Sequence, residues 1–141
     1  MQEKVEDIVV FTVPGLIPCS VNHIWDDAIY TGRDGYAHRG RKLSKQAVAF
    51  KYAVAIFAQG RTVAPATERE RKKAKYRVKV DVYFGPRQKG DGDNFLKNAI
   101  DSLVYAGVIH SDVNVIPTPE VHRDERHSPE SPRTTYIVER L

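Results

Sequence analysis

The chain has 141 residues, of which 41% are hydrophobic and 28% charged, with a formal net charge of +4. This composition is typical of one globular domain over residues 1–141 and excludes a disordered tail. The single cysteine, Cys19, excludes an intrachain disulfide, and no apolar run approaches the roughly 20 residues of a membrane-spanning helix. Because the N-terminus shows no signal-peptide pattern, we expect a cytoplasmic protein with no membrane partner.

The N-terminal half is predicted to hold one strand and one helix. Residues 7–13 (DIVVFTV) form a β-branched run, which predicts a strand at the centre of a sheet. Residues 14–42 combine turn formers and basic residues without helical periodicity, so we expect a long irregular stretch there. Ser44 is a suitable N-cap for a helix over residues 45–59, which Gly60 would end.

The C-terminal half is predicted to hold three strands and a second helix. Residues 61–75 have the composition of a mobile basic loop, and the alternation over residues 76–84 (YRVKVDVYF) predicts a half-buried strand. Residues 93–106 carry apolar side chains at the spacing of an amphipathic helix. Further strands are expected over residues 114–122 and 134–139.

The order of these elements predicts the fold class. Pro117 and Pro119 confine the strand over residues 114–122 to an edge or a bulge, because proline cannot donate to a central ladder. The order β-α-β-α-β-β predicts a single α+β domain with two main helices on one side of a mixed β-sheet.

Basic residues concentrate in two segments. Residues 61–79 carry eight basic and two acidic side chains, residues 31–45 carry five and one, and the rest of the chain therefore has a net charge of −6. Two basic segments on an otherwise acidic chain suit a polyanionic partner, although either segment alone is also compatible with a merely solvated surface. The candidate DNA-binding residues are Arg33, Arg39, Arg41, Lys42, Lys45, Arg69, Arg71, Lys72, Lys73, Lys75, Arg77 and Lys79.

The densest chemical signal is GDGDNFLKNAID, residues 90–101. Asp91 and Asp93 flank one glycine where the second helix is predicted to begin, and glycine leaves space beside the carboxylates for a ligand. Mg²⁺ prefers oxygen ligands, and phosphodiester sites commonly combine one or two carboxylates with the substrate phosphate. Lys97, one turn after Asp93, is placed to neutralise charge on a phosphate or to pair with Asp93. Taken alone, this segment is explained more simply by a capping aspartate and a surface ion pair.

The wider sequence pattern favours the metal site over a capping aspartate and a surface ion pair. Over residues 91–112, the run D-x-D-N-x-x-K-x-x-x-D followed by Asp112 resembles the hallmark of the RusA family of Holliday junction resolvases. The stretch VPGLIPCSVNHIW (residues 13–25) and Leu-Ser-Lys at 43–45 are similar to that family's N-terminal entry and its lead into the first helix. The resemblance spans roughly residues 8–116 and is most specific over residues 91–112.

The resemblance implies an activity and a set of site residues. It implies a homodimer that makes paired, symmetric nicks across four-way junction DNA in recombination and repair. Asp91, Asp93 and Asp112 would be the metal-binding catalytic carboxylates and Lys97 the catalytic lysine, with Mg²⁺ as the cofactor and Mn²⁺ as a substitute. Ser111 stands where the family often has an acidic residue, which leaves the number of metal ions open.

The path of the chain after the second helix decides whether one subunit can close this site. The helix over residues 93–106 would be about 20 Å long, and residues 107–112 reach about 20 Å when fully extended. Asp112 therefore meets Asp93 within one chain if the intervening segment runs straight back along the helix. Otherwise a second subunit must supply it. We expect closure within one chain.

Several other residues are assigned packing roles. We expect Asp101 to pair with Lys97 rather than bind metal. Tyr30 is placed to stack on unpaired bases, but ordinary packing is the simpler expectation for it and for Tyr36. Cys19 is expected to be a buried small hydrophobe. His110, His122 and His127, taken with Cys19, form neither a C-x-x-C nor an H-x₃-H pair, so surface or packing roles are the simpler expectation for these histidines.

Three other functions remain open at this stage. The first is a non-catalytic junction-binding or DNA-binding module in which the acidic cluster is structural. The second is a metal-dependent phosphohydrolase acting on nucleotides or RNA. A self-association protein without a nucleic-acid role is the third, and it leaves the basic segments and the acidic array unused.

Overall fold

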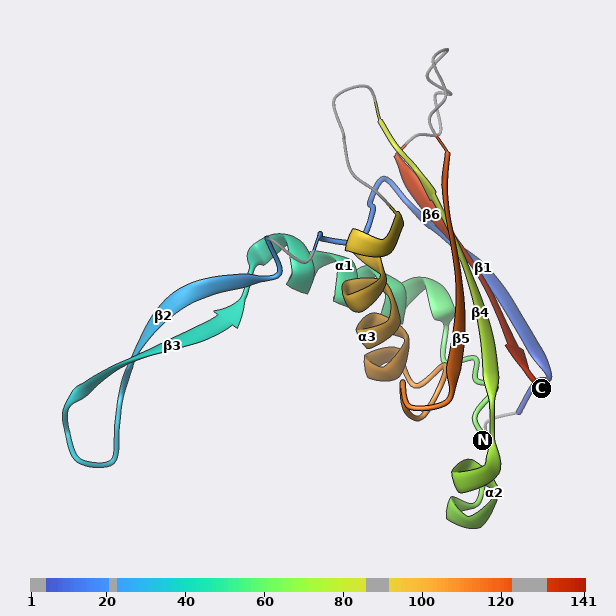
Figure 1. Cartoon of the computed structure of the whole chain (residues 1–141), viewed down its shortest axis with the longest axis horizontal. Coiled ribbons are helices and arrows are strands. Elements are labelled where there is room, and N and C mark those ends of the chain that lie inside the picture. The colour runs from blue at the N-terminus through green and yellow to red at the C-terminus, as the bar shows by residue number, and fades with distance from the viewer. Residues whose placement is uncertain (1–4, 21–22, 86–91, 123–131) are drawn as a thin grey trace.

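The computed structural model describes residues 5–20, 23–85, 92–122 and 132–141. Within these ranges the chain order is β1 (Ile8–Pro14), β2 (Trp25–Thr31), β3 (Ala37–Leu43), α1 (Lys45–Ala58), α2 (Glu68–Lys73), β4 (Tyr76–Tyr83), a 3-10 turn (Gly92–Phe95), α3 (Leu96–Ala106), β5 (Val115–His122) and β6 (Arg133–Arg140). The predicted α+β class, with two main helices and a mixed sheet, is confirmed (Figure 1). No helix in the described ranges combines the length and apolar character needed to cross a membrane.

The main sheet has the strand order β1-β6-β4-β5. Its pairs are antiparallel except β4 with β5, which run parallel. β5 lies at an edge, as its prolines predict. The prediction of a central position for β1 is wrong, because β1 forms the opposite edge. Its β-branched run reflects one buried and one exposed face: Val9 and Val13 are fully buried, whereas Ile8 and Val10 are about half exposed.

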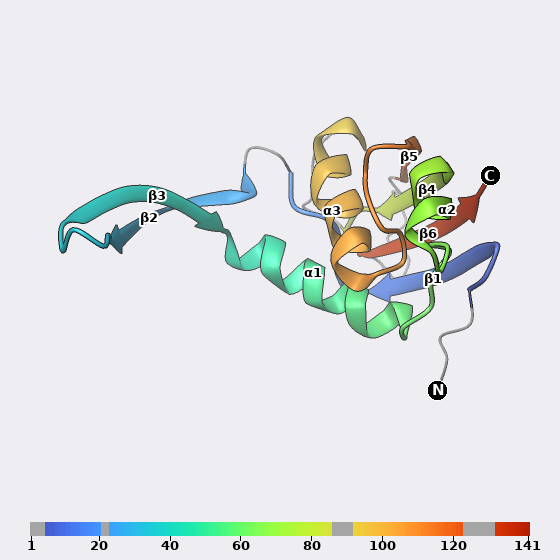
Figure 2. The ribbon, with the colours of Figure 1, turned by 90° about the horizontal axis from the view of Figure 1, so that it is seen from below.

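The hydrophobic core lies between one face of this sheet and the helices α1 and α3 (Figure 2). β4 alternates as predicted, because Tyr76, Val78 and Val80 are buried toward that core. Tyr136 of β6 connects the two layers: it is fully buried, and its hydroxyl donates to the carbonyl of Ala99 on α3 at 3.0 Å. Burial raises the pKa of this phenol well above its ordinary value.

Both ends of α1 and the C-terminal end of α3 follow the predicted capping chemistry, whereas α3 begins at Leu96 rather than at the predicted residue 93, and its N-cap Phe95 makes no side-chain hydrogen bond. The Ser44 hydroxyl accepts a hydrogen bond from the amide of Ala47 at 3.2 Å and so caps α1. α1 ends as Gln59 and Gly60 take left-handed conformations. Gly107, with a φ of 77°, ends α3 in the same way, because glycine adopts this conformation without a steric cost.

The irregular stretch expected over residues 14–42 is in part an antiparallel hairpin. β2 and β3 pair along their full length and project away from the main sheet and its helices (Figures 1 and 2). Tyr30 packs across the strands: its hydroxyl donates to the carbonyl of Arg41 at 2.8 Å, and a Cβ on Gly40 would lie 2.5 Å from its ring. The hairpin escaped prediction because its stability comes from cross-strand pairs rather than from an apolar face.

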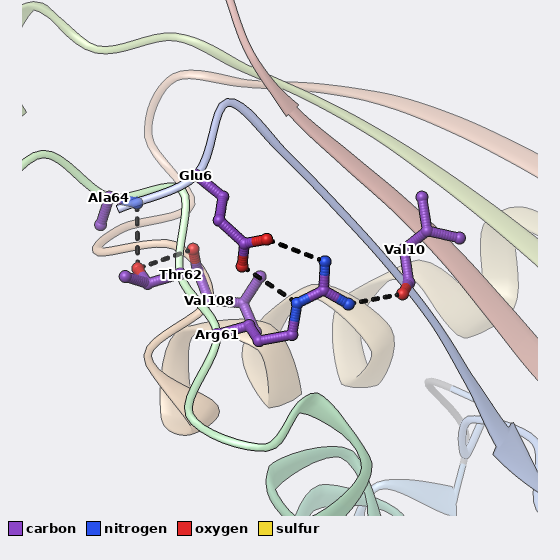
Figure 3. Close-up of polar contacts among 6 residues, drawn as sticks. All are labelled: Glu6, Val10, Arg61, Thr62, Ala64 and Val108. Atoms are coloured by element: carbon purple, nitrogen blue, oxygen red, sulfur yellow. Dashed lines mark hydrogen bonds and ion pairs between the residues drawn. The ribbon is translucent and has the colours of Figure 1, made fainter. Parts of the chain in front are cut away.

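The mobile loop expected over residues 61–75 is also corrected. Val63 is fully buried, and α2 occupies residues 68–73. Arg61 forms a two-pronged contact with Glu6, both hydrogen bonds being 3.0 Å, and donates to the carbonyl of Val10 (Figure 3). The hydrogen bonds to Glu6 raise the pKa of Arg61. This arginine therefore anchors the N-terminal segment to the residues after α1.

Candidate active site

A groove between α3 and β5 brings two of the predicted site residues together. Lys97 of α3 and Asp112, which precedes β5, line a common groove of about 290 Å³. Its other lining residues are Leu96, Ile100, Asp101, Val115 and Pro117. The groove therefore combines an apolar floor with carboxylate and ammonium groups.

The path of the chain after α3 explains how Asp112 reaches this groove. Gly107 reverses the chain direction, and its amide bonds the carbonyls of Leu103 and Val104. Val108 and Ile109 are then fully buried in the core, which fixes the returning segment against α3. Asp112 consequently lies beside α3, in the same groove as Lys97.

The other two predicted carboxylates are less fully described. Asp93 belongs to the 3-10 turn that leads into α3, but its side chain lies outside what the structure describes. Asp91 lies outside the described residues altogether. The assignment of Asp91, Asp93, Asp112 and Lys97 as one catalytic group therefore remains a prediction.

Lys97 forms the ion pair expected with Asp101, at 3.4 Å. Both side chains are about half exposed, and exposed pairs one helical turn apart stabilise a helix by roughly 0.3–0.5 kcal/mol. Such a weak pair costs little to break. The ammonium group of Lys97 is therefore available to an anion that enters the groove.

The predicted DNA-binding residues divide into two exposed groups and a paired remainder. The hairpin and its junction with α1 carry Arg33, Arg39, Arg41, Lys42 and Lys45, all exposed. α2 and the residue pair after it carry Arg69, Arg71, Lys72, Lys73 and Lys75, also exposed. The last two predicted residues face acidic partners on the sheet, as Arg77 lies 3.6 Å from Glu139 and Lys79 lies 3.7 Å from Glu120.

The two exposed groups lie at opposite ends of the molecule. The hairpin projects at one end and α2 lies at the other, with α3 and β5 between them (Figures 1 and 2). A nucleic acid that contacts both basic groups would therefore pass near the groove.

One cluster of potential metal ligands was missed by the sequence analysis. Asp81 of β4 and Glu120 and His122 of β5 place one ligand atom each within 4.8 Å of one another. A Glu-x-His pair on a strand puts both side chains on one face, which is a sequence signal for such a cluster. The third member depends on the pairing of β4 with β5, which the sequence does not give.

Comparison with known protein families matches residues 29–135 to the endodeoxyribonuclease RusA family model. The chain belongs to the RusA family. The match includes the acidic run, Lys97 and Asp112, and it leaves out the N-terminal stretch 13–25 that also resembles the family. No individually curated protein matches the chain. RusA membership supports an endodeoxyribonuclease that acts on Holliday junctions.

Proposed function

We propose that this RusA-family protein is a Mg²⁺-dependent nuclease that resolves four-way DNA junctions by paired, symmetric nicks in recombination and repair. The observation that carries the proposal is the shared groove of Lys97 and Asp112 in a chain of this family. Asp112 offers an exposed carboxylate beside an exposed ammonium group, a combination that suits both a hard cation and a phosphate. The proposed working form is a homodimer, since two cuts need two grooves.

Each site residue has a proposed role. Asp91, Asp93 and Asp112 hold Mg²⁺, for which Mn²⁺ can substitute, through their carboxylate oxygens. Bound Mg²⁺ lowers the pKa of a water molecule and polarises the scissile phosphate. Lys97 leaves Asp101 when DNA binds, and its ammonium group stabilises the negative charge that develops on the phosphate oxygens.

The basic residues of the hairpin and of α2 are proposed to hold the junction arms. A four-way junction brings phosphates close together, and lysine and arginine contacts release the counterions condensed on them. Binding should therefore weaken steeply as salt rises. Arg77 and Lys79 are the weakest candidates, because DNA would have to compete with their acidic partners.

The direct test is cleavage of a synthetic mobile four-way junction with and without Mg²⁺. We expect paired nicks with Mg²⁺ and none without it, and we expect no cleavage by Asp91→Asn. Linear duplex DNA, RNA and free nucleotides serve as comparison substrates. Faster hydrolysis of RNA or nucleotides would contradict the proposal in favour of another phosphohydrolase. Binding without cleavage under all conditions would leave a DNA-binding module.

A subunit-mixing experiment tests the arrangement of the site. We infer that Asp93 and Asp112 act together within one chain. A heterodimer of an Asp93→Asn subunit with an Asp112→Asn subunit then has two defective sites and stays inactive. A control heterodimer of either variant with the wild-type chain retains one working site and nicks one strand. Recovery of nicking in the doubly substituted heterodimer would show that the site forms across the interface.

A further inference from the structure

The face of the main sheet turned away from the helices carries a group of polar side chains at its β4–β5 end. Asp81 and Glu120 are directly opposite each other in the β4–β5 register. His122 lies two residues after Glu120, so the alternation of the strand puts both on this face. Val115 and Val121 of the same strand pack on the core side instead. The group is therefore separated by the sheet from the groove that holds Lys97 and Asp112.

The side chains of this group already converge. The Nε2 atom of His122 lies 3.0 Å from an Oδ atom of Asp81 and 3.9 Å from an Oε atom of Glu120. The ring is held in this orientation by stacking on Tyr83, with ring centroids 4.3 Å apart and planes 10° apart. The Asp81 side chain is only 10% exposed, although it belongs to the open face.

The spacing of these atoms suits a tetrahedral metal ion. Zinc–nitrogen and zinc–oxygen bonds of about 2.1 Å imply ligand atoms about 3.4 Å apart around the ion. The two distances from His122 Nε2 bracket that value. An imidazole nitrogen with two carboxylate oxygens favours zinc over magnesium, because magnesium takes oxygen ligands. Three protein ligands leave the fourth position to water.

Two carboxylates opposite each other on neighbouring strands also need a cation between them. Like charges in that position destabilise a sheet. Lys79 supplies a positive charge at present, with its Nζ atom 3.9 Å from Asp81 and 3.7 Å from Glu120. Both separations are long for a hydrogen-bonded ion pair, and the lysine side chain is 41% exposed. The side chain can therefore swing into solvent when a divalent ion enters.

We propose that Asp81, Glu120 and His122 form a Zn²⁺ site on the open face of the sheet, with Lys79 as the internal cation that the ion displaces. The bound ion clamps the edge strand β5 to β4. This site is separate from the proposed nuclease centre, so the two proposals can be tested independently.

The test is a calorimetric Zn²⁺ titration of the full chain in which Asp91, Asp93 and Asp112 are all replaced by asparagine. These substitutions remove the proposed nuclease centre as a source of metal binding. We expect one ion per chain, bound more tightly than Mg²⁺, and an unfolding temperature that rises with Zn²⁺ concentration because the ion binds the folded state. No Zn²⁺ binding, or equal affinity for Mg²⁺, would overturn the proposal.

Substitutions in the same background distinguish the metal site from a purely structural ion-pair network. His122→Ala and Glu120→Gln should each weaken Zn²⁺ binding by about tenfold or more. Lys79→Met should tighten it, because the competing cation is gone, whereas a structural network predicts no gain. Glu139→Gln, which removes a carboxylate paired with Arg77, is the matched control and should leave binding unchanged. Zn²⁺ affinity that is unaltered in both His122→Ala and Glu120→Gln would also overturn the proposal.

Discussion

The groove and the hairpin differ in what holds them in place. Lys97 and Asp112 stand on segments fixed by a continuous core, in which Leu103, Val108 and Ile109 are fully buried. Among the described residues the hairpin pairs with no third strand, and its Ile29 is 76% exposed. A two-stranded hairpin is only marginally stable by itself. The groove residues therefore stand on rigid elements, and we predict that the hairpin gains order from the nucleic acid that it binds.

Charge separates the two regions further. The groove pairs its ammonium group with the carboxylate of Asp101, whereas the hairpin exposes arginines along one strand. Arg39 and Arg41 are two residues apart on β3 and so share a face. Substitutions in the groove should therefore change the rate of cleavage, and substitutions in the hairpin should change junction affinity.

The largest effect is expected from Lys97→Met. Loss of one group that stabilises developing charge costs about 100- to 1000-fold in rate. Junction affinity should stay within a few-fold of wild type, because one exposed charge is lost from a surface with many. Single-turnover cleavage together with an electrophoretic binding assay measures both quantities. Lys51→Met on α1 is the control, and equal rate losses in the two variants would remove Lys97 from the site.

The double variant Arg39→Ala/Arg41→Ala should act on binding instead. We expect about a tenfold weaker junction affinity and a salt dependence less steep by about two units, since two phosphate contacts are lost. Cleavage of fully bound junction should keep its wild-type rate. Affinity measured across a series of salt concentrations decides the matter. An unchanged salt slope would show that this face of the hairpin does not contact phosphates.

Gly40→Val separates the shape of the hairpin from its charge. The added side chain would collide with the Tyr30 ring and break its hydrogen bond to Arg41. Ordering the disturbed hairpin on binding should cost about 1 kcal/mol more than in the wild type. We therefore expect about a fivefold weaker junction affinity, with an unchanged salt dependence. The comparison variant is Gly35→Ala at the hairpin tip, where a Cβ meets no atom within 4 Å but the φ of +82° disfavours any side chain. Equal affinity in Gly40→Val and the wild type would contradict a role for hairpin shape.

Tyr136→Phe should have the smallest effect, which should be limited to the stability of the main sheet and the helices α1 and α3. Loss of the buried hydrogen bond to Ala99 is expected to reduce the free energy of unfolding by about 1 kcal/mol. The pKa of Tyr136 is raised in the folded state, so its contribution to stability is present below the ordinary value of 10.0 and is lost at higher pH. The variant should therefore lose less stability than wild type above pH 10.0. Urea unfolding at a series of pH values measures this difference. The junction affinity should stay unchanged, and a weaker affinity in Tyr136→Phe would show that the stability of the main sheet and its helices affects binding by the hairpin.

Local sequence patterns predicted the elements that carry the groove. The alternation of β4 and the apolar spacing of α3 are properties of consecutive residues, and Ser44 and Gly107 mark helix ends by their own chemistry. The acidic run, Lys97 and Asp112 were recognised differently, by the resemblance of their combined pattern to the RusA family. Membership of the RusA family is confirmed, whereas the roles of these residues remain predictions.

Features that depend on distant pairing were not predicted. The edge position of β1 follows from its pairing with β6, about 125 residues away along the chain. The Asp81, Glu120 and His122 group follows from the parallel register of β4 and β5. For β1 and for the Asp81, Glu120 and His122 group, the interaction joins segments far apart in the sequence, which no local pattern reveals. The hairpin is a local element that was missed for another reason: Asp34-Gly35 at its turn is a hairpin signal, but the flanking strands lack an alternating apolar pattern.

The central claim is that the groove hydrolyses junction DNA with Mg²⁺. The most direct measurement is single-turnover cleavage of a mobile four-way junction by wild type and Asp112→Asn, each saturated with the junction and titrated with Mg²⁺. We expect paired nicks by wild type that depend on Mg²⁺, and a rate at least about 100-fold lower in the variant with junction binding intact. Cleavage by Asp112→Asn at the wild-type rate would contradict it.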